Sequence, residues 1–149
     1  MAKTARILVS LHGKKVGLDN RGNLVVGGKT VSAQDDTGVA QKTQGAPSTL
    51  NATGALTPAL VGAGIVTSTT GAGVTATLSV GTDFTTAFGA DIAIGEAFDW
   101  HVINTGGNTF TVTQNTDHTV VGAGAVATAT SAQFRTRRTA ATTWITYRI

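Results

Sequence analysis

The sequence predicts an all-β protein: an antiparallel β-sandwich or jelly-roll-like body that follows an extended N-terminal β arm. Three observations predict this class. Thr, Ala and Gly supply 28, 22 and 19 of the 149 residues, whereas helical domains draw on Leu, Glu and Lys. Apolar and polar residues alternate with a period of two in several short runs. Turn sequences rich in Gly and Asn separate these runs, as in sandwiches built from many short strands.

Residues 1–34 are expected to form a basic arm with short strands. A β-branched run covers residues 4–11, and a hairpin is expected over residues 16–26, with Asn20, Arg21 and Gly22 at its turn. These segments contain few large apolar residues, and an isolated hairpin is marginally stable in water. The arm is therefore expected to pair with another surface.

Residues 35–57 are expected to be a linker or an extended segment, and residues 58–149 to form the body. The stretch around the expected linker is rich in Gly, Ser, Thr, Gln and Asp, and it contains both prolines of the chain. It shows neither helical nor strand periodicity, which is typical of a linker. Alternating segments begin only after it.

Strands are expected in the body at residues 74–80, 98–103 and 110–113, where apolar side chains recur at every second position. The Asn- and Gly-rich residues 104–108 separate the last two segments, and we interpret them as a hairpin turn. The expected core consists of the apolar residues that share one face of these two segments: Phe98, Trp100, Val102, Phe110 and Val112.

The remainder of the body contains one expected helical turn and two further β segments. Phe84 and Phe88 are four residues apart, as on one face of a helix. Residues 125–138 alternate again, and so does the C-terminal stretch around Trp144, for which the pattern leaves the inward face open.

Charge is segregated along the chain. Residues 1–42 contain seven of the eleven basic residues and three acidic ones, whereas residues 43–134 contain five acidic residues and no Lys or Arg. The last fifteen residues contain four arginines and no acid. This pattern favours contact with an acidic surface or between subunits. Nucleic acid is not expected as a partner, because no dense basic stripe is interleaved with exposed aromatic residues.

The candidate binding residues are cations of the two basic segments. Those expected to attach the arm are Lys3, Arg6, Lys14, Lys15 and Arg21. Those expected between subunits are Arg135, Arg137 and Arg148. Arg135 and Arg137 would share a strand face, where planar guanidinium groups could pair with carboxylates of an adjacent chain. An ordinary solvated face is the alternative that the pattern leaves open.

No catalytic or metal-binding arrangement is expected. The chain has no cysteine, which excludes disulfides, thiol catalysis and cysteine-based zinc sites. Asp99 and His101 share an expected strand face, and Asp117 precedes His118. A solvated or inter-subunit His–Asp contact is the favoured interpretation, because no nucleophile elbow, HExxH spacing or paired-carboxylate motif accompanies them. We therefore expect neither an enzyme nor a cofactor.

Two glycine motifs match the loose G-x-G-x-x-A form of a dinucleotide-binding loop, at residues 71–76 and 122–127. Such a loop directs a helix N-terminus at the pyrophosphate, whereas a strand pattern follows both motifs here. Glycine turns are therefore expected. No apolar run approaches the ~20 residues of a membrane span, and the N-terminus lacks a secretory signal, so a protein made in the cytoplasm is expected.

Two segments of the body carry a resemblance to a known group of proteins. The F-D-W-x-V-I-N-T-G strand and turn at residues 98–106 and the F-R-x-R strand at residues 134–137 resemble a C-terminal β-module of tailed-bacteriophage virion proteins. The body as a whole is similar in particular to capsid decoration (cement) and head-fibre proteins.

Membership would imply a homotrimeric β-structure without catalysis. It would place the protein on the outer capsid surface of a virion assembled in the host cytoplasm, with the major capsid protein as its partner. A tail-fibre or receptor-binding β-module is the alternative.

Overall fold

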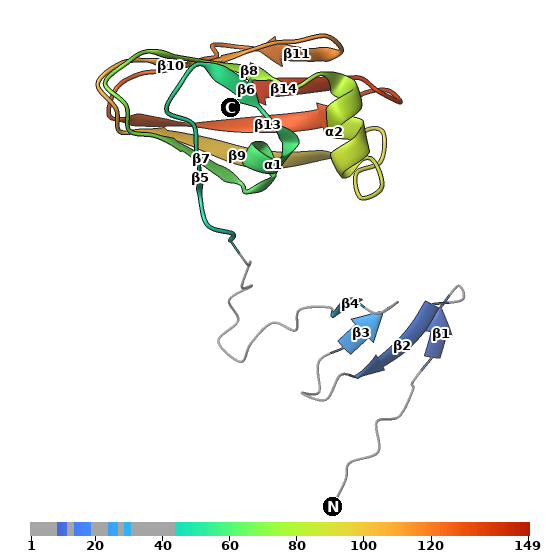
Figure 1. Cartoon of the computed structure of the whole chain (residues 1–149). Helices are drawn as coiled ribbons and strands as arrows, with labels where there is room; N and C mark the ends of the chain where they lie inside the picture. Colours follow the sequence, from blue (N-terminus) through green and yellow to red (C-terminus); the bar gives the residue numbers. More distant parts are fainter. Residues whose placement is uncertain (1–8, 12–13, 19–23, 27–28, 31–43) are drawn as a thin grey trace, which may run out of the picture. The chain divides into compact units, whose positions relative to one another are not determined.

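The chain divides into two compact units, Met1–Thr43 and Gln44–Ile149. The computed structural model describes five stretches of the chain: residues 9–11, 14–18, 24–26, 29–30 and 44–149 (Figure 1). Side chains are described for the last of these stretches.

The described strands of the N-terminal unit form one antiparallel sheet in the order β1-β2-β3-β4. Their bounds are β1 Val9–Leu11, β2 Lys14–Leu18, β3 Leu24–Val26 and β4 Lys29–Thr30. The hairpin expected over residues 16–26 is the β2–β3 pair, in which Val16 lies opposite Val26. The described residues of this unit thus form four short strands.

The second unit, which is described throughout, is mostly β, with two sheets and two short helices. The four-stranded sheet has the order β12-β10-β8-β6, with bounds β6 Gly54–Leu56, β8 Val74–Leu78, β10 Phe110–Thr113 and β12 Ala125–Val126. The six-stranded sheet has the order β11-β14-β13-β9-β7-β5, with bounds β5 Ser48–Thr49, β7 Ile65–Ser68, β9 Ala97–Asn104, β11 His118–Val121, β13 Thr130–Arg138 and β14 Trp144–Arg148.

The first six strands of this unit alternate between the two sheets. β5, β7 and β9 pair in parallel in one sheet, and β6, β8 and β10 pair in parallel in the other (Figure 1). The chain therefore winds in successive coils, each of which adds one strand to each sheet. Threonine hydroxyls connect neighbouring coils, with 3.0 Å between Oγ1 of Thr49 and Thr67 and 3.0 Å between those of Thr77 and Thr113.

Both sheets are mixed, so the expectation of antiparallel pairing is corrected. Antiparallel pairs occur where β13 joins β9 and β14 and where β12 joins β10. Apolar residues at every second position indicate that one face of a strand is buried. They do not indicate whether the neighbouring strand is parallel or antiparallel. The parallel coils require their connections to cross between sheets, which no local turn sequence reveals.

The hairpin expected between residues 98–103 and 110–113 is wrong, because β9 and β10 belong to different sheets. The buried side chain of Asn104 donates to the carbonyls of Asn108 (2.8 Å) and Val126 (3.0 Å), which holds the crossing between the sheets. Gly106 has no positive φ. Instead, a Cβ at this position would overlap the carbonyl oxygen of Thr70 in the preceding coil.

The compact unit begins at Gln44, which differs from the expected boundary at residue 58. β5 and β6 lie in the segment expected to be a linker or an extended segment, and strands of two and three residues are too short to show periodicity. Residues 35–43 of that segment lie outside the described residues. Helix α1, Pro58–Gly62, follows directly: Thr57 caps it by accepting a hydrogen bond from the Leu60 amide, and proline occupies the favoured first turn.

Helix α2, Gly81–Phe88, contains the helical turn expected from Phe84 and Phe88. Phe84 is fully buried, and its ring centroid lies 4.4 Å from that of His118 and 5.9 Å from that of Trp144. The helix thus contributes its apolar face to the core of the sheets.

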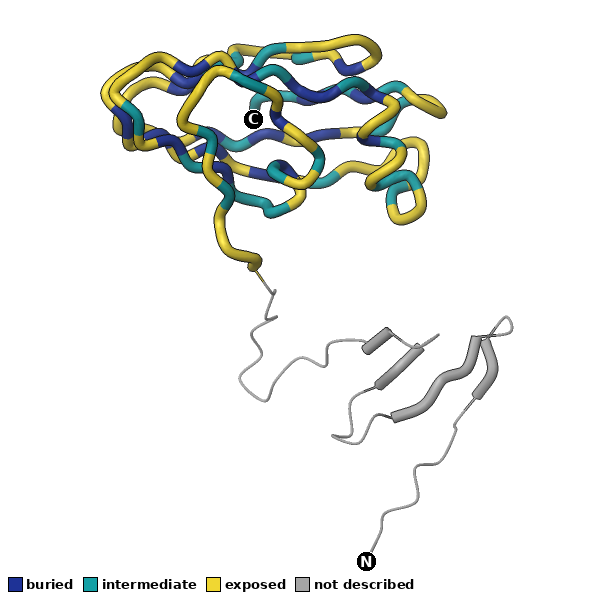
Figure 2. The backbone as a smooth tube through the Cα atoms, viewed as in Figure 1, coloured by how far each residue is buried: buried dark blue, intermediate teal, exposed yellow. Residues whose placement is uncertain are grey.

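One core cluster draws on both sheets and both helices (Figure 2). Trp100, Val102, Phe110 and Val112 are buried in it, and Phe98 is partly buried against it. The Trp100 and Phe134 rings are stacked with centroids 4.8 Å apart. Trp144 is also fully buried, which settles the inward face of β14.

We expect the substitution Ala129→Gly to stabilise the protein. Ala129 has φ 56°, in the left-handed region that costs an L-residue ~1–2 kcal/mol. Glycine adopts this conformation freely but loses more backbone entropy on folding. The net increase in the free energy of unfolding should therefore be up to about 1 kcal/mol. Urea unfolding measures it. Ala127→Gly is the matched control, because Ala127 has no positive φ and should lose stability on the same change; equal effects at both positions would contradict this account.

Candidate interaction surface

An ion pair lies on the exposed face of the six-stranded sheet, where β9 and β13 bring Asp99 opposite Arg135. Arg135 donates from Nε to Asp99 Oδ1 (2.7 Å) and from Nη2 to Asp99 Oδ2 (2.8 Å). The hydrogen bond from Arg135 holds the pKa of the Asp99 carboxyl below its usual value, and the same bond raises the pKa of Arg135. The carboxylate expected from an adjacent chain is therefore supplied within the chain.

We expect Arg135→Ala to return the pKa of Asp99 towards its ordinary range, because the largest cause of its lowered pKa is removed. The change in stability should be small, since the pair is exposed to solvent. A pH titration followed by carboxyl NMR measures the pKa directly. Arg137→Ala is the control and should leave it unchanged, because the Arg137 Nε atom donates to the Gly95 carbonyl. An unaltered pKa in Arg135→Ala would refute the pairing.

The other two arginine candidates also have partners within the chain. Arg137 is exposed and donates to the Gly95 carbonyl over 3.2 Å. Arg148 is half-buried, donates to the Ala125 carbonyl over 2.7 Å, and lies over the Phe134 ring with its guanidinium carbon 5.6 Å from the centroid. Arg148 thus joins the C-terminal strand to the first residue of β12.

We use the name outer face for the solvent side of the six-stranded sheet around this ion pair. Register places Asp99, Arg135, Tyr147 and Val121 in one row across four strands. Val121 is exposed and Tyr147 is half-buried. Tyrosine and arginine are enriched at protein interfaces and often dominate their binding energy. The outer face therefore carries side chains of the kinds that protein interfaces use.

His118 is fully buried, so the expectation of a solvated or inter-subunit contact is wrong for this residue. Its Nδ1 lies 3.2 Å from the Ser79 carbonyl oxygen and its Nε2 lies 2.9 Å from Thr146 Oγ1. A carbonyl only accepts hydrogen bonds, so Nδ1 carries the proton and Nε2 accepts from Thr146. Burial lowers the pKa of His118 to about 4.

The hydrogen bonds continue from His118 through the core. Because Thr146 donates to His118, it accepts from Thr136, whose Oγ1 lies 2.8 Å away. Thr136 in turn accepts from Trp100 Nε1 over 2.9 Å. This relay joins four strands of the six-stranded sheet, and the Ser79 carbonyl joins it to the end of β8. Its role is structural, since every member is buried.

The arm residues fall mostly outside the described part of the chain. Lys14 and Lys15 lie in β2, opposite Leu11 and Ser10 of β1. Lys3, Arg6 and Arg21 lie outside the described residues. Attachment through these cations stays a prediction.

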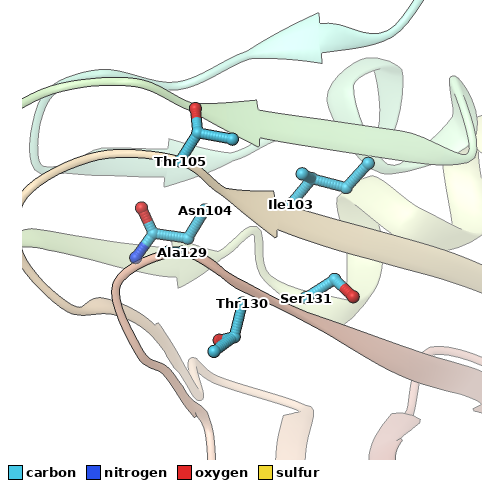
Figure 3. Close-up of a pocket in the computed structure, with 6 residues that line it drawn as sticks. All are labelled: Ile103, Asn104, Thr105, Ala129, Thr130 and Ser131. Atoms are coloured by element: carbon cyan, nitrogen blue, oxygen red, sulfur yellow. The ribbon is translucent and has the colours of Figure 1, made fainter.

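A shallow pocket of about 380 Å³ lies where β9 ends and β13 begins (Figure 3). Its lining contains no charged side chain and consists of Ile103, Asn104, Thr105, Ala129, Thr130 and Ser131. Ile103 is one of four large apolar residues that are exposed among the described side chains. No sequence pattern marks this pocket, because residues 104–108 have the composition of a hairpin turn.

The described residues contain no group of three His, Asp or Glu side chains that could hold a metal ion. Their buried side-chain polar atoms all have hydrogen-bond partners. Both glycine motifs lead into strands, β8 and β12, and so lack the helix that a dinucleotide loop requires. Neither helix in this part of the chain has the length and apolarity needed to cross a membrane.

No family model matches the chain, and no curated protein and no solved structure is significantly similar to it.

Proposed function

We propose that the protein is a structural component of a bacteriophage virion that binds the outside of the capsid and decorates or stabilises it, as a cement protein or head-fibre base. One observation carries the proposal. The two segments that resemble phage virion modules are adjacent strands in register, with Trp100 opposite Phe134 and Asp99 opposite Arg135. The resemblance thus involves residues that interact with one another, inward as a ring stack and outward as an ion pair.

The chemistry of the described surface supports a binding role without catalysis. Two titratable groups of the described residues have a lowered pKa, and both are engaged: exposed Asp99 by Arg135, and buried His118 by the relay. The outer face offers Arg, Tyr and Val side chains, which suit contact with a protein.

We also propose that the two sheets form a β-sandwich. Both contribute to one core cluster, as sandwiches do. The parallel coils favour a sandwich over a jelly roll, since jelly rolls are built from antiparallel Greek keys.

The protein is proposed to be a homotrimer. The body is lean in aromatic residues, and both sheets end in strands of two or three residues at an unpaired edge. Burial between subunits would add apolar contact, and closed symmetry would protect such edges. Light scattering at micromolar concentration should give three times the 15.0 kDa chain mass. A mass of one chain would contradict the trimer.

Attachment is proposed to reside in the basic arm, whose strands could add to an edge of the capsid protein. Replacing Lys3, Arg6, Lys14, Lys15 and Arg21 by Gln in the full chain should slow binding to undecorated capsids and reduce its salt dependence. Three arms per trimer would bind with avidity, so occupancy should also fall. Replacing Arg135 and Arg137 by Gln tests the outer face in the same assay. Unchanged binding of the arm variant would place attachment in the second unit.

A further inference from the structure

The eight residues between α2 and β9, Gly89–Glu96, form a loop that Arg138 holds from the side of the core. Arg138 donates from Nη1 to the carbonyls of Gly89 and Ile92, both over 3.0 Å, while its guanidinium carbon lies 5.8 Å from the centre of the Trp144 ring. The Gly95 amide donates to the Arg138 carbonyl over 2.8 Å. The loop is thus fixed in shape before any partner arrives.

This loop presents an apolar side chain to solvent. Ile94 is 60% exposed, as is the C-terminal Ile149, and no large apolar residue among the described side chains is more exposed. The Ala93 amide donates to the Glu96 carboxylate over 2.8 Å, which closes a tight turn around Ile94. A fixed loop with an apolar tip is a preorganised binding element, because little entropy remains to be lost on contact.

The shallow pocket lies at the opposite end of the same two strands. β9 begins at Ala97 beside the loop and ends at Asn104 in the pocket lining, while β13 runs back from Thr130 to Arg138 under the loop. The eight residues of β9 extend over roughly 23 Å at about 3.3 Å per residue. Ile94 therefore cannot enter the pocket of its own chain.

We infer that the Ile94 tip of one copy inserts into the pocket lined by Ile103, Ala129 and Ser131 of a second copy. The inference deepens the proposed homotrimer and rests on that part of the proposed function. A tip and a pocket at opposite ends of one molecule define a head-to-tail contact, which either closes into a ring or extends as a filament. Closure after three copies gives the proposed trimer.

The side chains of the tip and of the pocket favour a second copy of this chain as the occupant of the pocket. The pocket is uncharged and has an exposed isoleucine in its lining, so it suits an aliphatic side chain. The tip is flanked by Asp91 and Glu96, whereas none of the six residues that line the pocket is charged. The pocket lining therefore does not repel the acidic residues beside the tip, whereas a tip-to-tip contact would oppose the carboxylates of both copies.

Cysteine cross-linking tests the contact sharply, since the chain contains no cysteine of its own. The full-length Ile94→Cys/Ser131→Cys double variant should form disulfide-linked species under mild oxidation with diamide, and the series should stop at the trimer. Mixing the two single variants should give linked dimers, while each single variant alone should stay unlinked. The control pair Ile94→Cys/Thr119→Cys, with Thr119 exposed on β11, should not link.

The outcomes separate this contact from the trimer itself. A wild-type trimer by light scattering together with an unlinked double variant would overturn the tip-and-pocket contact alone. A series that continues beyond three chains would support the contact and overturn the closed trimer. Ile94→Asp should reduce the trimer fraction at least tenfold at micromolar concentration, whereas Ile149→Asp, at an equally exposed isoleucine, should not; equal behaviour of the two variants would also overturn the contact.

Discussion

Trp100→Ala is expected to unfold the second unit or to lower its melting temperature steeply. Trp100 is fully buried, stacked on Phe134, and hydrogen-bonded through Nε1 to Thr136. Truncating a buried tryptophan to alanine costs ~3–5 kcal/mol, and domains are stable by only ~5–15 kcal/mol. The loss also leaves the Thr136 hydroxyl without its donor in a buried site. Thermal and urea unfolding followed by circular dichroism measure the effect.

Trp100→Phe separates the loss of volume from the loss of the hydrogen bond. Because this variant keeps an aromatic ring against Phe134, it should destabilise the protein less than Trp100→Ala, although it too lacks the Nε1 donor. Val121→Ala is the surface control, because Val121 is 45% exposed, and should change stability by no more than about 0.5 kcal/mol. A Trp100→Ala curve that coincides with that control would mean that the core is assigned to the wrong face of β9.

Acid is expected to destabilise the protein through His118. The pKa of this histidine falls from 6.5 to about 4 on folding because burial disfavours the imidazolium. Between these values the unfolded chain binds a proton that the folded chain does not, so the free energy of unfolding decreases as pH falls. Neutral His118 thus contributes about 3 kcal/mol to the free energy of unfolding relative to acid conditions. This contribution is fully present above pH 6.5 and is lost progressively down to about pH 4.

Protonation would also reverse the buried relay. A proton on Nε2 must be donated to Thr146, and Thr146 then no longer has an acceptor in His118. Urea unfolding at pH 4.5 and pH 7 measures how steeply the free energy of unfolding depends on pH. His118→Gln should weaken this dependence between pH 6.5 and pH 4. His101→Asn is the control, because His101 is exposed on the outer face. An equal slope in wild type and His118→Gln would show that other groups cause the acid sensitivity.

The sequence predicts the β segments whose alternation is long enough to mark a buried face. β8, β9, β10 and β13 lie where alternation occurs, and the Phe84–Phe88 spacing marks α2. β5 and β6 are too short to leave such a pattern. Helix α1, which was not expected, does carry a local signal: the capping residue Thr57 is followed by proline at the first helical position.

Topology and the candidate surface depend on contacts between distant residues. Residues 104–108 have a composition that suits both a hairpin turn and a connection between two sheets. Only the hydrogen bonds from Asn104 to the Asn108 and Val126 carbonyls distinguish these two structures. The strand pattern placed Arg135 on an exposed face, but its pairing with Asp99 depends on the register of β9 and β13. His118 carries no sequence signal of burial, because the groups that surround it, the Phe84 ring and the Thr146 hydroxyl, come from α2 and β14.

Imaging of phage particles tests the central proposal most directly. Electron microscopy of virions assembled with and without this protein should show protrusions on the outer capsid surface, present only in the first sample and with threefold symmetry in averaged density. Identical capsids in the two samples, or additional density confined to the tail, would contradict the assignment as a capsid decoration protein.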